Sequence, residues 1–215
     1  MRAILLLPEP ATDVRVAGVA LAPSEGPLAP EVVAPAVRVA WYWRDALLKI
    51  AHHKATLAVS LEAPPDDPLD HALALTRAAA GLATELGAIA VFWEPTALVH
   101  ETAMFAEQAE DASRDDPPIF LWVAFEGSEK DDGTRSLLTR GVRALGGVME
   151  IEVDGSRRDG EHVFEVVADA ALFALTSRAE VGDGDVLEVT RGEVRVRVMP
   201  SLRGDGSKAW RLRVA

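Results

Sequence analysis

The spacing of apolar residues predicts that strands and helices alternate along this chain. Uncharged apolar runs at Ala3–Leu7, 56–61 and 88–93 are typical of buried strands. Between the second and third runs, Asp67 provides a helix N-cap and Pro68 suits the first helical position. A strand, a helix and a strand in this order predict a parallel, right-handed βαβ unit in the N-terminal half.

The rest of the N-terminal half shows weaker patterns. Four prolines at 22–36 argue against a regular helix, so we expect an ordered surface loop there, followed by a short strand at 37–40. Apolar residues at intervals of three and four predict a helix from residue 43, and Thr102–Asp111 suits another. The apolar run at 119–125 predicts a third strand that carries Phe120 and Trp122 on one face.

The C-terminal half alternates sharply between apolar and charged residues. Strands at 149–153, 193–198 and 209–214 should each present one face to a core and one to water, around a helix at 161–177. Glu opposite Arg on neighbouring strands would be favourable, whereas Arg opposite Arg would not. The charged turn at 126–133 is where two lobes are expected to meet.

These elements predict an α+β protein. We expect residues 1–215 to form a single domain with a mixed sheet, an N-terminal βαβ unit and C-terminal antiparallel strands, with helices packed mainly on one side. A chain of 215 residues with 49% hydrophobic content is long enough to bury such a core.

Composition narrows the compartment and the partners. The chain contains no Cys, which excludes disulfides, thiolate zinc sites and cysteine nucleophiles and fits a reducing cytoplasm. A net charge of −12 disfavours nucleic acid and anionic membranes as partners. The first apolar run is too short for a signal peptide, and no later run approaches the roughly 18 residues of a membrane helix. We therefore expect a soluble cytoplasmic protein.

A candidate acid–base site follows the end of the 88–93 strand. Glu94, His100 and Glu101 come after it, and sites in parallel sheets gather at the carboxyl ends of strands. With His53 they form a set suited to general acid–base catalysis or metal binding. Simpler alternatives are that His100 pads a loop and that His53 interacts with the negative end of a helix. Because no phosphate-loop, calcium-loop or serine-hydrolase motif occurs, we expect no cofactor and no metal.

Two other groups are candidates for binding a partner. Trp41, Tyr42 and Trp43 form an aromatic cluster in which Trp43 has the helical spacing of a core residue and alternation turns Tyr42 outward. Residues 191–215 hold seven basic and two acidic side chains, a local charge of +5, against −17 in the rest of the chain. An anionic ligand or acidic protein face would fit this basic segment, and a solvated strand face balanced by glutamates is the alternative. Its candidate partner-binding residues are Arg195, Arg197, Arg211 and Arg213.

Short runs in a fixed order carry a family resemblance. They are Trp-Tyr-Trp-Arg-Asp at 41–45, His-Lys at 53–54, Asp-Pro at 67–68, Ala-Leu-Thr-Arg at 74–77, Ala-Val-Phe-Trp at 90–93, Leu-Val-His at 98–100, Leu-Trp-Val at 121–123, Thr-Arg-Gly at 139–141, Leu-Gly at 145–146, Met-Glu-Ile-Glu-Val at 149–153 and Asp-Gly-Asp at 183–185. Over nearly its whole length the chain resembles the bacterial family catalogued as domain of unknown function 4261. It departs from that pattern at Gly147 and Val148, which separate the Leu-Gly pair from the Met-Glu strand. The resemblance implies a bacterial protein, and that family has no established activity.

Two functional hypotheses remain. The first is a non-enzymatic protein-interaction module, of inhibitor or immunity type, whose partner is another protein. The second is an enzyme or small-ligand binder that uses His53, Glu94, His100 and Glu101. The two differ in whether these four side chains meet in space.

Overall fold

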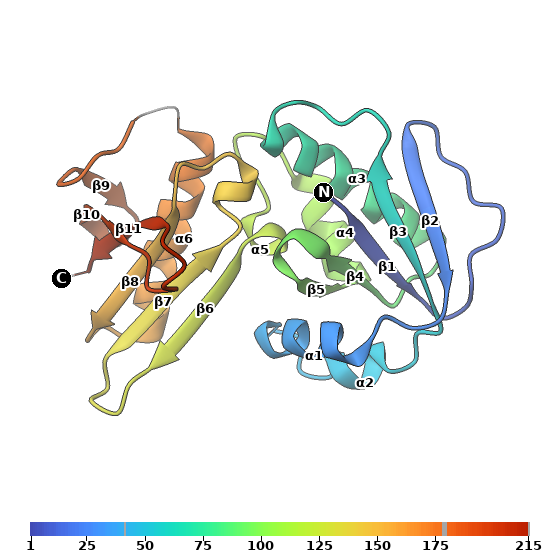
Figure 1. Ribbon diagram of the computed structural model, residues 1–215, viewed down its shortest axis with the longest axis horizontal. Coiled ribbons are helices and arrows are strands. Elements are labelled where there is room, and N and C mark those ends of the chain that lie inside the picture. Colours follow the sequence, from blue (N-terminus) through green and yellow to red (C-terminus); the bar gives the residue numbers. More distant parts are fainter. Residues whose placement is uncertain (41, 178–179, 215) are drawn as a thin grey trace. The chain divides into compact units, whose positions relative to one another are not determined.

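The computed structural model describes residues 1–40, 42–177 and 180–214. It confirms the α+β class with a mixed sheet and C-terminal antiparallel strands. The chain forms two compact units, Met1–Trp122 and Val123–Ala215, and each unit has its own sheet (Figure 1). In the described part of the chain, no helix has the length and apolar character needed to cross a membrane.

The first unit is built on a five-stranded sheet in which each strand is antiparallel to its neighbours. The strands, in spatial order, are β2 (Val19–Glu25), β3 (Ala55–Leu61), β1 (Ala3–Leu7), β4 (Ala90–Trp93) and β5 (Leu98–Glu101).

The expected βαβ unit is present in a split form. Helix α3 (Pro68–Glu85) connects β3 to β4, and these two strands run in the same direction. They do not pair with each other, because β1 lies between them and is antiparallel to both. The side chains of Leu5 and Leu6 point to opposite faces of the sheet and are both fully buried, which explains why this strand occupies the centre.

Helix α3 begins where its sequence signals predicted. The Asp67 carboxylate accepts hydrogen bonds from the backbone N–H groups of Leu69 and Asp70, and Pro68 stands in the first turn. These bonds satisfy donors that a helix start otherwise leaves open.

Helices cover both faces of the first sheet rather than mainly one (Figure 1). Helices α1 (Pro30–Val39) and α2 (Ala46–Ile50) pack with Phe92 and Val99 on one face, and α3 packs on the other. On the face of α3 lies α4 (Thr102–Asp111), which has the predicted bounds. A sheet whose central strands are apolar on both faces requires this double cover.

The loop expected at 22–36 is replaced by the end of β2 and the first part of α1, and the strand expected at 37–40 is replaced by the end of that helix. Helix α1 begins at Pro30, where the missing N–H costs no hydrogen bond, and it tolerates Pro35 within its length. Val33 and Ala36 are its buried residues, so an apolar stripe offsets the poor helix propensity of proline.

The third apolar run also differs from its prediction. It forms a short helix, α5 (Ile119–Trp122), before β6 begins at Ala124. Trp122 is fully buried, donates its indole N–H to Thr76 Oγ1 at 2.8 Å, and stacks against Trp93. Phe120 is 47% exposed, so the two rings do not share a face.

The second unit is built on a six-stranded mixed sheet. Only β8 and β11 pair in parallel, and the other neighbours are antiparallel. Helix α6 (Gly160–Thr176) packs against one face through buried valines such as Val163 and Val167. In spatial order the strands are β6 (Ala124–Glu129), β7 (Arg135–Arg140), β8 (Glu150–Ser156), β11 (Lys208–Arg213), β10 (Gly192–Pro200) and β9 (Val186–Val189).

The predicted junction at 126–133 lies inside the second unit. Strand β6 continues to Glu129, and the following turn returns the chain into β7. Lys130 N–H donates to the carbonyl of Thr134 across this turn. The division between the two units falls earlier, between Trp122 and Val123.

Candidate functional site

The predicted acid–base residues do not gather at one strand end. Residues 98–101, which we expected to be a loop, form β5 and run back along β4, so Glu101 pairs with Ala90 at the start of that strand. Glu94 follows the other end of β4. The backbone positions of Glu94 and Glu101 are therefore about 13 Å apart along the hairpin.

Each of the two carboxylates has its own cation. Arg2 donates to both oxygens of Glu94 and lowers the pKa of that carboxyl from its ordinary value. Lys49 Nζ lies 2.6 Å from Glu101 Oε1. Both pairs lie at the surface, where such pairs contribute little stability.

His100 is fully buried in the first unit. Its Nε2 is 3.1 Å from the Leu121 carbonyl, and its Nδ1 is 2.5 Å from the Tyr42 hydroxyl. Since a carbonyl only accepts, Nε2 carries the ring proton and Nδ1 accepts from Tyr42. Burial lowers the pKa of His100 to about 4, so the neutral ring is a packed structural group at neutral pH.

Tyr42 combines an exposed edge with an inward hydroxyl. The residue is 40% exposed, and its hydroxyl faces both His100 and the Val99 carbonyl, the latter at 3.0 Å. Burial of the hydroxyl raises the pKa of Tyr42. Of the other aromatic candidates, Trp43 is buried as its helical spacing predicted, and Trp41 lies outside the described residues.

His53 is held by backbone groups on both sides of its ring. Nδ1 donates to the Ile50 carbonyl, and Nε2 accepts from Leu28 N–H at 2.7 Å. His53 precedes β3, and His100 lies on β5. Two other strands lie between β3 and β5, so these strands are about 14 Å apart. The two histidines thus serve separate parts of the core. No group of metal-ligating side chains that could hold an ion occurs among the residues described.

The four candidate arginines do come together, on the outward face of β10 and β11. Arg195 lies directly opposite Arg213, and Arg197 lies directly opposite Arg211. The unfavourable Arg-beside-Arg arrangement is therefore present twice. The buried face of β10 carries Val194 and alternates with these arginines as predicted.

Two of the four arginines are neutralised by acidic neighbours. Arg197 Nε donates to Asp183 Oδ1 at 2.9 Å, and Arg211 Nη2 lies 3.1 Å from Glu152 Oε2. The second of these pairs joins residues in register on β8 and β11, which is the predicted Glu-to-Arg cross-strand pair.

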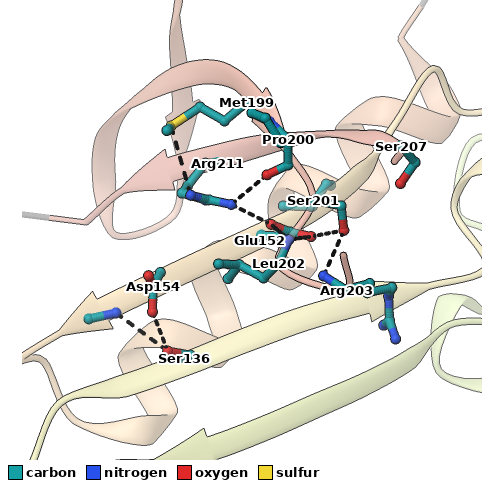
Figure 2. A network of polar contacts seen from close by, with 12 residues as sticks. Ser136, Glu152, Asp154, Met199, Pro200, Ser201, Leu202, Arg203, Ser207 and Arg211 are labelled. Atoms are coloured by element: carbon teal, nitrogen blue, oxygen red, sulfur yellow. Dashed lines mark hydrogen bonds and ion pairs between the residues drawn. The ribbon is translucent and has the colours of Figure 1, made fainter. Parts of the chain in front are cut away.

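Glu152 is the centre of a buried network that sequence reasoning missed (Figure 2). The Ser201 hydroxyl donates to its carboxylate at 2.6 Å, and Leu202 N–H donates at 3.1 Å. Arg211 bonds both to Glu152 and to the Pro200 carbonyl. These bonds hold the segment after β10 over the sheet. Part of the sheet face that the sequence predicts to be exposed to water is therefore buried.

Two glycine-rich segments, at 182–185 and 204–208, are held by hydrogen bonds to their aspartate side chains. Asp183 accepts from Val198 N–H, and Asp185 accepts from Gly182 N–H. Asp205 accepts from both the N–H and the hydroxyl of Ser207. The bonds of Asp185 and Asp205 are those of local turns, whereas the bond from Val198 ties Asp183 to β10.

The other two arginines form an uncompensated row. Arg195 and Arg213, here called the arginine row, are both exposed, and no ion pair is formed by either among the residues described. Arg195 uses one N–H to bond the Gly184 carbonyl at 2.8 Å. Its neighbour on β9 is Val186, which is 47% exposed.

The chemistry available at the arginine row is anion binding. Each guanidinium carries five N–H donors in a planar fork that suits carboxylate and phosphate groups.

No protein-family model, curated protein or solved structure matches this chain.

Proposed function

We propose that this chain is a non-enzymatic protein-interaction module, of inhibitor or immunity type, that binds an acidic surface of a partner protein through the arginine row. The observation that carries the proposal is the direct opposition of Arg195 and Arg213 on an exposed strand pair, where neither forms an ion pair with any residue that the structure describes. The second hypothesis, an enzyme or ligand binder, has less support, because its four residues each bond to a different partner.

The energetics of the strand pair support a role in binding. Like charges directly opposite each other destabilise an antiparallel pair by several tenths of a kcal/mol, up to about 1 kcal/mol. A partner carboxylate placed between Arg195 and Arg213 turns that repulsion into charge-assisted hydrogen bonds. Arginine is also enriched among the residues that dominate protein interfaces.

The acidic character of the whole chain is compatible with an acidic partner. The net charge is −12, but the Debye length at physiological ionic strength is about 8 Å. Charges beyond that range are largely screened, so the local field of the arginine row decides close contact. The neighbouring Arg197 and Arg211 are already paired and serve to fix the row in place.

We further propose a cytoplasmic location and membership of the bacterial family catalogued as domain of unknown function 4261. The absence of Cys supports the location, because cytoplasmic proteins do not depend on disulfides. The ordered runs that end in Met149–Val153 and Asp183–Asp185 support the family proposal.

Affinity capture from the native host tests the function. Wild-type protein should retain a stoichiometric protein partner, and the double variant R195E/R213E should lose it. The matched control is R143E, which reverses one exposed charge in the same unit away from β10 and β11. Equal retention by R195E/R213E would show that the arginine row is not the binding face, and no partner-specific retention by wild type would contradict an interaction role.

A further inference from the structure

The positive charge of the arginine row is confined to Arg195 and Arg213, because the residues on either side of them are acidic or neutralised. Two residues before Arg195 on the same face of β10 is Glu193, which lies directly opposite Glu188 on β9. Two residues along a strand span about 6.7 Å, so an acidic pair flanks the arginine row at that distance. The row on the other side, Arg197 and Arg211, is neutralised by its own acidic partners.

This geometry discriminates between kinds of anion. An extended acidic surface that covers the arginine row must also bring a carboxylate to within about 7 Å of Glu193 or Glu188, where like charges repel. A single compact group that carries two negative charges avoids both glutamates. The Cβ atoms of directly opposed residues are about 5 Å apart, so the flexible side chains of Arg195 and Arg213 can reach the same compact anion.

We propose that the arginine row binds one phosphorylated side chain of the partner protein. A phosphorylated residue carries a charge of about −1.5 to −2 and three strong acceptor oxygens, which matches two arginines that form no ion pair within the described ranges. The Gly184 carbonyl holds the Arg195 guanidinium in a defined position, and exposed Val186 beside it offers an apolar contact to the residue next to the phosphate. This inference rests on the proposed function, because it names the chemistry of the partner at the same face.

Three fluorescent peptides of equal length test the inference by anisotropy titration against the full chain. One is uncharged apart from a single phosphoserine, one carries glutamate in its place, and one carries four glutamates in alternate positions. The phosphopeptide should bind at least tenfold more tightly than either glutamate peptide. The variant R195Q/R213Q should weaken phosphopeptide binding at least tenfold, whereas R143Q should leave it unchanged.

The flanking acidic pair supplies a second, independent readout. E193Q removes one carboxylate of the flanking acidic pair without altering any arginine, and should strengthen binding of the four-glutamate peptide several-fold. Equal or tighter wild-type binding of the four-glutamate peptide would overturn the phosphate inference and leave the proposed function standing. If R195Q/R213Q binds the phosphopeptide as tightly as wild type does, the phosphate inference is also overturned. The affinity-capture experiment tests the proposed function separately.

Discussion

Buried His100 should make the stability of the first unit depend on pH. The ring is fully enclosed, with Nε2 bonded to the Leu121 carbonyl and Nδ1 to the Tyr42 hydroxyl. Its pKa is lowered from 6.5 to about 4, because burial penalises the charged form and the bond to Leu121 restores only part of that loss. The perturbation we propose is His100→Gln, which cannot titrate and retains one donor and one acceptor.

The sign and size of the effect follow from the two pKa values. Between pH 6.5 and about 4 the unfolded chain binds a proton at His100 and the folded chain does not, so stability is present above this window and falls as the pH falls. The shift from 6.5 to about 4 corresponds to about 3 kcal/mol in total, since each pKa unit is worth about 1.4 kcal/mol. From pH 7 to pH 5 the loss at His100 should be about 2 kcal/mol.

This loss can be measured by urea unfolding between pH 7.5 and pH 4.5, with tryptophan fluorescence as the signal, because four of the five tryptophans belong to the first unit. The quantity of interest is the free energy of unfolding of wild type minus that of H100Q, in which the titration of every other group cancels. This difference should fall by about 2 kcal/mol between pH 7 and pH 5. A pH-independent difference for H100Q would refute the neutral, buried state of His100.

Three further substitutions test other parts of the structure by urea unfolding. Glu152→Ala removes the acceptor of the Ser201 hydroxyl and the Leu202 N–H, removes the ion-pair partner of Arg211, and should cost about 3 kcal/mol; a loss below about 0.5 kcal/mol would contradict the network. Asp67→Ala removes the N-cap of α3 and should cost about 1 kcal/mol, whereas Asp66→Ala, one residue earlier, should cost less than half of that. Gln at both positions of the arginine row should leave the free energy of unfolding unchanged or raise it by up to about 1 kcal/mol, and a clear loss would mean that Arg195 and Arg213 are structural.

Local signals in the sequence were sufficient where a segment determines its own structure. The bounds of α4 and the start of α3 follow from capping and helical spacing, which act within one turn. The alternation on β8 and β10 likewise fixed which side chains face the core, since Ile151 and Val194 are buried. The direct opposition of Arg195 and Arg213 needed the register of two strands, which alternation alone does not supply.

Non-local competition explains what the sequence did not reveal. Insertion of β1 between β3 and β4 depends on contacts across more than 80 residues, and it converts the expected parallel pair into two antiparallel pairs. The apolar run predicts a strand at Trp122, but the segment forms a short helix, and the Trp122 indole N–H donates to the buried Thr76 hydroxyl. The four acid–base candidates were separated for the same reason: their placement depended on an antiparallel hairpin rather than on one strand end.

Burial of Glu152 was the hardest feature to anticipate. Its position in an alternating strand predicts an exposed side chain, and Ile151 and Val153 on either side are indeed in the core. The segment that contains Ser201 covers it from 49 residues away, and no motif announces that contact. The consequence for the binding face is direct, because Glu152 removes Arg211 from the set of free cations.

Binding of the partner through Arg195 and Arg213 is tested most directly by arginine side-chain NMR. Nε–H signals of ¹⁵N-labelled protein can be followed while the captured partner is added. The signals of Arg195 and Arg213 should shift strongly and show slowed solvent exchange, while that of Arg143 stays in place. Saturation with the partner without a shift at Arg195 and Arg213 would contradict the assignment of the binding face.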